Sequence, residues 1–99
     1  MFDRQTITVR CEPDADGWRC AVAVGSDSGA TQHDVIVHRD YLRRIAPPGS
    51  PVESFVEASF GFLLEREPRE SILRRFDLPA IGRFFPEYED VIRARLAGV

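Results

Sequence analysis

The first third of the chain alternates between apolar and polar residues. The apolar positions are Ile7, Val9 and Cys11 in one run and Trp18, Cys20, Val22 and Val24 in a second run. A period of two puts every apolar side chain of a strand on one face, so the pattern predicts two β-strands. Between them, the sequence Pro-Asp-Ala-Asp-Gly at 13–17 supplies turn residues and predicts a hairpin.

The pattern allows two registers for this hairpin, because directly opposed residues of an antiparallel pair share a face. One register places Asp16 and Gly17 at the turn and Cys11 opposite Val22. The other register places Cys11 opposite Cys20. Asp-Gly suits a two-residue turn in which Gly17 takes a positive φ, so turn chemistry favours the first register.

A third strand follows the turn Gly-Ser-Asp-Ser-Gly at 25–29. Its alternating positions are Thr31, His33, Val35 and Val37 on one face and Gln32, Asp34, Ile36 and His38 on the other. The three strands predict an antiparallel meander over about residues 5–38. From residue 40 the period changes, and Asp40 can cap a short helical turn that Pro47 must end.

The clearest helix signal begins at Ser50. Ser50, Pro51 and Glu53 match a capping box with proline at the first helical position. Apolar residues then recur at three- and four-residue spacing, which predicts a helix over about 51–67 that covers the sheet. Gly61 in its interior costs roughly 1 kcal/mol relative to alanine, so we expect a close backbone contact there.

The rest of the sequence predicts two or three short helices. Ile72, Leu73 and Phe76 form one apolar face, Asp77 can cap the next segment, and a last helix follows Pro86.

The predicted fold class is therefore α+β, with a three-stranded antiparallel meander covered by a long helix and by short C-terminal helices. A chain of 99 residues has surface for one core, so we predict a single domain over 1–99 whose helical part spans 40–98.

Composition narrows the range of functions. All 13 positive charges are arginines, and 16 acidic residues give a net charge of -3, so the chain lacks the positive field that non-specific nucleic-acid binding uses. The longest apolar stretch, Ala21 to Val24, is far too short to cross a membrane. Residues 1–5 have no basic flank leading into an apolar run, so we expect a cytoplasmic protein without a secretory signal.

The cysteines and histidines do not indicate a metal site. Cys11 and Cys20 are too few for a disulfide scaffold and lack C-x-x-C spacing, so we interpret both as reduced thiols. His33 and His38 differ in parity on one strand and point to opposite faces, so they cannot hold one ion together. We expect no metal and no cofactor.

A thiol and imidazole pair is one candidate site, because Cys20 and His33 share a predicted face. A tight turn at 26–27 places Cys20 opposite His33, whereas looser turns place His33 opposite Val22 or Val24. A nucleophilic thiol needs such a base within hydrogen-bond reach and usually a third group that orients the imidazole. No third group is visible, so a thiol enzyme is the least favoured interpretation.

Arginines after residue 65 form a second candidate site, a basic face for nucleic acid. The residues concerned are Arg69, Arg74, Arg75 and Arg83. Glutamates are interleaved with them, and Glu70 precedes Arg74 by four residues, in the orientation of a solvated helical ion pair. Nucleic-acid binding is therefore the alternative function and not the favoured one.

Aromatic residues concentrate in the C-terminal half and form the third candidate site. They are Phe76, Phe84, Phe85 and Tyr88. Part of this cluster exceeds what one thin core can bury, so we expect some of it on the surface, where large apolar patches mark partner interfaces. A self-complementary patch would give a two-fold homodimer. The alternative is that these rings pack the short helices onto the long one.

Several segments resemble a set of small bacterial proteins to which no activity is assigned. These segments are 59–68 (SFGFLLEREP), 71–73 (SIL), 76–78 (FDL), 84–88 (FFPEY) and the T-x-H-x-V-x-V pattern of the third strand. The resemblance spans about residues 31–88 and implies no activity. Three strands followed by a helix are also similar to the HicB-type antitoxins, but their Pro-Asp-Leu-Pro-Gly-Cys-like segment is absent, which limits this similarity to the fold.

No catalytic constellation is visible in the sequence. We therefore predict a small, soluble binding or regulatory protein that is not an enzyme and acts through protein–protein contacts, as a homodimer or with another protein. A nucleic-acid-binding regulator is the alternative, and no membrane contact is expected.

Overall fold

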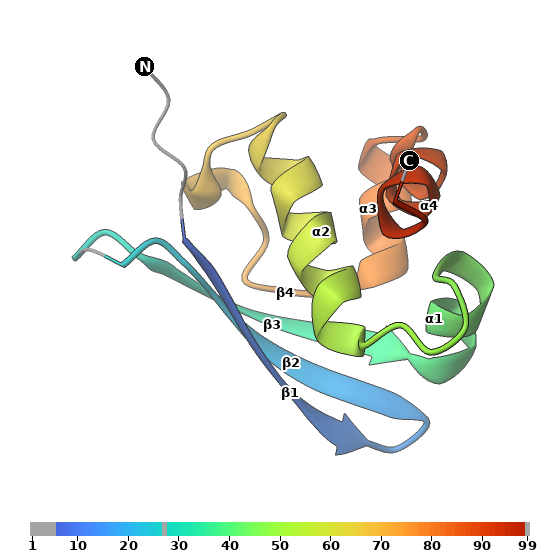
Figure 1. The fold of residues 1–99 in the computed structure, drawn as a ribbon. Helices are drawn as coiled ribbons and strands as arrows, with labels where there is room; N and C mark the ends of the chain where they lie inside the picture. The colour runs from blue at the N-terminus through green and yellow to red at the C-terminus, as the bar shows by residue number, and fades with distance from the viewer. Residues whose placement is uncertain (1–5, 27, 99) are drawn as a thin grey trace.

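The computed structural model describes residues 6–26 and 28–98 and shows an α+β fold (Figure 1). Three strands come first: β1 (Ile7–Asp14), β2 (Gly17–Val24) and β3 (Thr31–His38). Neighbouring strands pair antiparallel, as the alternating pattern predicts. Residue 5, the expected start of the sheet, residues 1–4 and Asp27 of the second turn lie outside the described residues.

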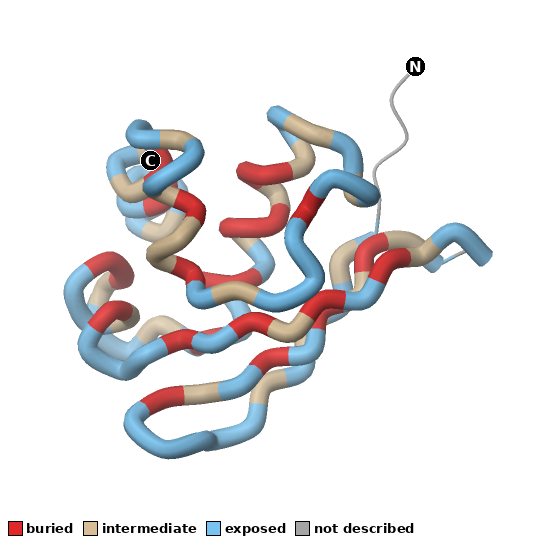
Figure 2. Tube along the Cα trace, turned by 180° about the vertical axis from the view of Figure 1, so that it is seen from behind, coloured by how far each residue is buried: buried red, intermediate tan, exposed pale blue. Residues whose placement is uncertain are grey.

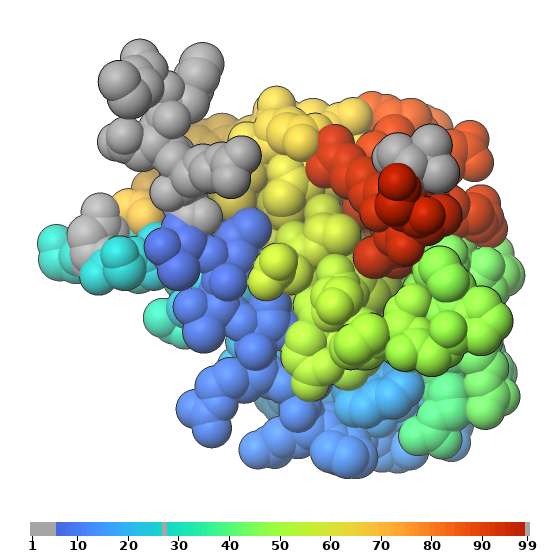
Figure 3. Space-filling view, viewed as in Figure 1, coloured from blue at the N-terminus to red at the C-terminus, as the bar shows by residue number. Residues whose placement is uncertain are grey.

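The helices follow the three strands and lie on one face of the sheet (Figure 1). The α-helices are α1 (Arg39–Ile45), α2 (Val52–Leu64), α3 (Ile81–Phe84) and α4 (Tyr88–Leu96). Short 3₁₀ turns, η1 (Arg69–Ser71) and η2 (Leu78–Ala80), connect the last elements. On the face seen in Figure 3, α2 lies between β1 and α4, and it contacts both.

A fourth strand, β4 (Arg75–Asp77), corrects the helix expected around Ile72, Leu73 and Phe76. β4 pairs parallel with β3, which gives the sheet order β1-β2-β3-β4. The backbone N–H of Asp34 donates to the carbonyl of Arg74 at 2.7 Å, so pairing with β3 holds this segment extended. Only η1 remains helical in this region.

The hairpin adopts the register that turn chemistry disfavoured, with Cys11 opposite Cys20. Ala15 and Asp16 form the turn, and Ala15 takes a φ of 50°. Gly17 therefore does not supply the turn conformation. It begins β2, where a Cβ would collide with the backbone carbonyl of Val37, so the residue is needed for close strand approach.

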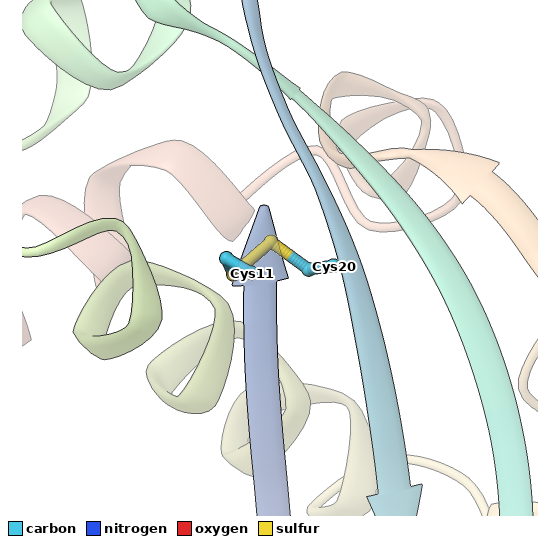
Figure 4. Close-up of a disulfide and its surroundings, with 2 residues drawn as sticks. All are labelled: Cys11 and Cys20. Carbon is cyan, nitrogen blue, oxygen red and sulfur yellow. A yellow bond between two sulfur atoms is a disulfide. The ribbon is translucent and has the colours of Figure 1, made fainter. Parts of the chain in front are cut away.

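Cys11 and Cys20 form a disulfide, so the interpretation of both as reduced thiols is wrong (Figure 4). The N–H of Gly25 donates to the carbonyl of Thr6, which places the hydrogen-bonded pairs of this ladder on the even-numbered residues of β1. Cys11 and Cys20 thus form a non-hydrogen-bonded pair, the closer kind, with a Cα–Cα distance of 4.0 Å. The register brings the two sulfur atoms together.

The core lies between the sheet and the helices. Buried positions alternate along β2 and β3 (Figure 2), and Val22, Val24, Val35 and Val37 are fully buried. Phe55 and the other apolar residues of α2 face them across the core. The opposite face of β3 exposes its polar residues and 41% of Ile36.

The start and interior of α2 differ from expectation in two details. Ser50 forms no capping box, because its hydroxyl donates to the carbonyl of Pro47 at 2.7 Å and Pro51 is the N-cap. Gly61 has open space where a Cβ would lie, so the expected close contact is absent there. None of the helices in the described part of the chain is long and apolar enough to cross a membrane.

Candidate functional site

An apolar pocket of about 330 Å³ lies between the end of α2, the segment that leads into β4, and α3. Its lining residues are Leu63, Glu67, Ser71, Ile72, Leu73, Phe76, Ala80, Ile81, Phe84 and Phe85. Residues of α2, η1, β4, η2 and α3 thus line one hollow. Its volume reaches the lower end of the range for sites that bind small molecules, and its lining is mainly apolar, as in such sites.

The pocket has two large apolar residues that are mostly in solvent. Leu73 is 51% exposed and Phe84 is 66% exposed, whereas the neighbouring Ile72 and Ile81 are buried. α3 is a single turn, and its buried Ile81 fixes the turn against the core while Phe84 lines the pocket from an exposed position. Two exposed apolar side chains beside an apolar hollow form a surface that association would remove from water.

The inner wall is held by aromatic packing. The Phe85 ring meets the buried Phe62 of α2 edge-on at 5.9 Å, and the Phe76 ring lies 6.0 Å from the buried Phe60. These contacts connect α3 and β4 to α2. Ring packing against α2 thus holds the inner wall of the pocket in place.

Polar contacts fix the end of α2 against α4. Arg66 stacks on the Phe62 ring at 3.6 Å and pairs with Glu87 at 3.1 Å, just before α4. Arg95 of α4 pairs in turn with Glu65 at 2.6 Å. Arg95 and Arg66 lower the pKa of the Glu65 carboxyl. The last turn of α2, which supplies one wall of the pocket, is thereby anchored.

Among the described residues that line the pocket, Glu67 is the one with a charged side chain. Burial raises the pKa of its carboxyl, because low-dielectric surroundings disfavour the charged form. Its carboxylate forms no ion pair with another residue of 6–26 or 28–98. The pocket therefore combines an apolar interior with one unpaired acidic group.

The structure brings together three of the four aromatic residues singled out in the sequence. Phe76, Phe84 and Phe85 all line the pocket. Tyr88 does not, since it is fully buried and shares a hydrogen bond of 2.7 Å with the hydroxyl of Ser59. The cluster is thus divided between surface and core. Phe84 is exposed, as expected for a surface patch, whereas Tyr88 packs in the core, as the alternative expected.

The Cys20 and His33 pair does not form. Cys20 lies opposite Val35 and is bonded to Cys11, while His33 lies opposite Val22. A disulfide sulfur is not a thiolate nucleophile. The thiol enzyme therefore lacks its nucleophile in this structure.

His33 instead links β3 to the pocket wall. Its Nδ1–H donates to the carbonyl of Leu73 at 2.8 Å, and its Nε2 accepts from the hydroxyl of Thr31 at 2.8 Å. The ring packs 5.3 Å from that of Phe60. Burial lowers the pKa of the imidazole, which keeps it neutral in this arrangement.

The four arginines singled out in the sequence do not lie on one face. Arg69 is largely buried, donates to the carbonyl of Val24 and pairs with Glu70. Arg74 donates to the carbonyl of Gln32 at 3.4 Å. Arg75 pairs with Asp34 on the outer face of the sheet at 3.6 Å. Arg83 lies exposed on α3.

Leu73 and Glu67 were not identified from the sequence as residues of a candidate site. A helical period placed Leu73 on a buried face, and only the pairing of β4 reveals that its side chain is exposed. Glu67 is one of several charged residues near the end of the predicted helix, and nothing in the sequence distinguishes it from them.

Comparison with protein-family models, curated proteins and solved structures finds no match. The fold and the site define an α+β domain with helices on one sheet face and an apolar pocket at the end of its longest helix. No group of three histidine, cysteine or acidic side chains that could hold a metal occurs in the part of the chain that the structure describes.

Proposed function

We propose that this chain is a non-catalytic protein-interaction domain, and that its docking surface is the pocket with Leu73 and Phe84. One observation carries the proposal: Phe84 exposes 66% of its surface beside an apolar hollow of about 330 Å³. Aromatic side chains next to apolar pockets are the residues that dominate binding energy at protein interfaces. Burial of apolar surface at such an interface stabilises the complex by roughly 25 cal/mol per Å².

The arginines support nucleic-acid binding less well. Arg69, Arg74 and Arg75 each donate to or pair with a group of the same chain. A phosphate would have to replace those contacts, and the net charge of -3 opposes its approach. The nucleic-acid alternative stays a prediction.

The disulfide bears on the compartment in which the protein works. Structural disulfides persist mainly in oxidising surroundings, whereas the cytosol keeps thiols reduced. The Cys11–Cys20 bond therefore weighs against the cytoplasmic location expected from the sequence. That location stays a prediction.

The proposed docking surface can be tested by photo-crosslinking in cells that produce the protein. A photoreactive phenylalanine analogue replaces Phe84, and in a control it replaces Ile36, which is 41% exposed on the opposite side of the sheet. We expect one adduct of defined mass from position 84 and none from position 36.

A second variant makes the result specific to the pocket. Leu73→Asp changes only an exposed side chain and leaves the backbone carbonyl that His33 binds. We expect the adduct from position 84 to disappear in this variant. Equal adducts from both positions, or an adduct that survives Leu73→Asp, would contradict the proposed docking surface.

A further inference from the structure

The surface around Phe84 presents a projecting ring and a hollow side by side. Phe84 lines the pocket and is nevertheless 66% exposed, and Leu73 on the same pocket is 51% exposed. A two-fold interface requires a patch that complements itself, because residue i contacts j and j contacts i. A projection next to a hollow satisfies this condition, since two copies can exchange their rings.

The pocket and the residue that precedes Phe84 carry charges of opposite sign. Glu67 in the pocket and Arg83 beside Phe84 have opposite sign, and neither forms an ion pair within the described residues. Most arginines of the described chain are engaged, for example Arg66, Arg75 and Arg95. Arg83 is therefore available to a carboxylate that lies outside its own chain.

We propose that the partner is a second copy of this chain, in a two-fold homodimer where Phe84 of each copy enters the pocket of the other. Arg83 of each copy then pairs with Glu67 of the other. This inference rests on the proposed function, because it names the occupant of the same docking surface.

Charge complementarity distinguishes this occupant from an arbitrary apolar partner. A purely apolar segment would cover the Glu67 carboxylate without a counter-charge, and burying an unpaired charge is costly. Arg83 directly precedes Phe84 and is exposed outside the pocket lining, so the segment that supplies the ring also carries a cation. Pairing also occurs twice in a symmetric dimer, so each copy satisfies both of its free charges.

Sedimentation equilibrium of the purified full chain, over a range of concentrations, tests the dimer. The wild type is expected to dimerise, and Phe84→Asp is expected to raise the dissociation constant by roughly 30-fold or more, as for a hot-spot residue. Ile36→Asp is the matched control, since it also places a carboxylate at an exposed apolar residue but on the other face of the sheet. It should leave the dissociation constant unchanged.

A charge exchange tests the proposed ion pair. Glu67→Arg and Arg83→Glu each place like charges together and should weaken the dimer by roughly tenfold. The double variant restores opposite charges and should recover most of the lost affinity. Glu57→Arg, at an exposed position of α2 outside the pocket lining, controls for the change in net charge. Circular dichroism confirms the folding of each variant.

Two results would overturn the inference. One is a wild type that stays monomeric at several hundred micromolar, and the other is a double variant no tighter than its single parents. The first result leaves the proposed function standing if the crosslink from position 84 has a mass other than twice that of the chain. Failure of the crosslink itself would instead remove the docking surface.

Discussion

The Nδ1–H of His33 donates a hydrogen bond of 2.8 Å to the backbone carbonyl of Leu73, forty positions further along the chain. This bond connects the buried face of β3 to the segment that forms one wall of the pocket. Thr31 donates to the other ring nitrogen, so the imidazole is held in its neutral form.

Acidification should therefore lower the free energy of unfolding, because it protonates His33. The pKa of His33 is lowered by burial and by nearby Arg74, so between its folded value and the unfolded value of about 6.5 the unfolded chain binds more protons. The contribution of neutral His33 to the free energy of unfolding is complete above about pH 6.5 and is lost as the pH falls below this value. Urea unfolding from pH 7.5 to 5.5 should show this loss, and His33→Gln should reduce it. His38→Gln, at an exposed position, serves as the control, and equal slopes in both variants would refute the assignment.

The disulfide should contribute to stability through the unfolded chain. It joins residues nine positions apart, and closing a loop of this size removes roughly 2 to 3 kcal/mol of chain entropy from the unfolded state. The double variant Cys11→Ala with Cys20→Ala should lower the free energy of unfolding by about that amount. Denatured, non-reduced protein should contain no thiol that reacts with Ellman's reagent. Two reactive thiols would show that the bond does not form.

Two glycines should respond to alanine in opposite directions. Gly17→Ala places a Cβ against the carbonyl of Val37 and should cost about 1 to 3 kcal/mol, as overpacking does. Gly61→Ala meets open space inside α2 and should stabilise the fold by roughly 0.5 to 1 kcal/mol, because alanine is the better helix former. Thermal unfolding of the two variants measures both effects. Similar shifts in the same direction would contradict the strand contact at Gly17.

The buried pair Ser59 and Tyr88 should show coupling in a double-mutant cycle. The Tyr88 hydroxyl and the Ser59 hydroxyl lie 2.7 Å apart, and the latter donates to the carbonyl of Phe55. Tyr88→Phe should therefore cost about 1 kcal/mol, since the Ser59 oxygen loses its donor. In the Ser59→Ala background the same change should cost much less. Additive losses would indicate that the two hydroxyls do not interact.

The strands were predictable because they depend on a local period of two. β3 has the expected bounds, whereas β2 begins one residue earlier than expected, at Gly17. His33 and His38 point to opposite faces as their parity requires. The helix expected at 51–67 ends earlier, at Leu64, and continues as a turn before Pro68. End positions of this kind depend on individual hydrogen bonds, which periodicity does not specify.

The register and the disulfide were not predictable from the same pattern. Both registers kept the apolar side chains on one face, and the choice depended on whether Gly17 served the turn or the neighbouring strand. Val37, whose carbonyl excludes a side chain at Gly17, lies twenty residues away. Turn chemistry considers only adjacent residues and therefore favoured the wrong alternative. The error about the cysteines had a separate cause, because their interpretation as reduced thiols rested on their small number and on the missing C-x-x-C spacing.

The candidate site was visible only in part. Phe76, Phe84 and Phe85 were identified from composition, because aromatic residues are numerous for so small a core. Leu73 was not, because its exposure depends on β4, a three-residue strand whose partner residues in β3 lie 41 positions earlier. Non-local pairing of short segments leaves no period in the sequence.

The disulfide also lies on the outermost strand of the sheet. β1 has a neighbour on one side only, so it is the long strand that local fluctuations can most readily detach. A covalent bond at Cys11, near the middle of β1, prevents this strand from separating without β2, whose other edge is hydrogen-bonded to β3. The edge strand β1 should therefore open only together with β2. The amide protons of the two strands should exchange with solvent deuterium at similar rates.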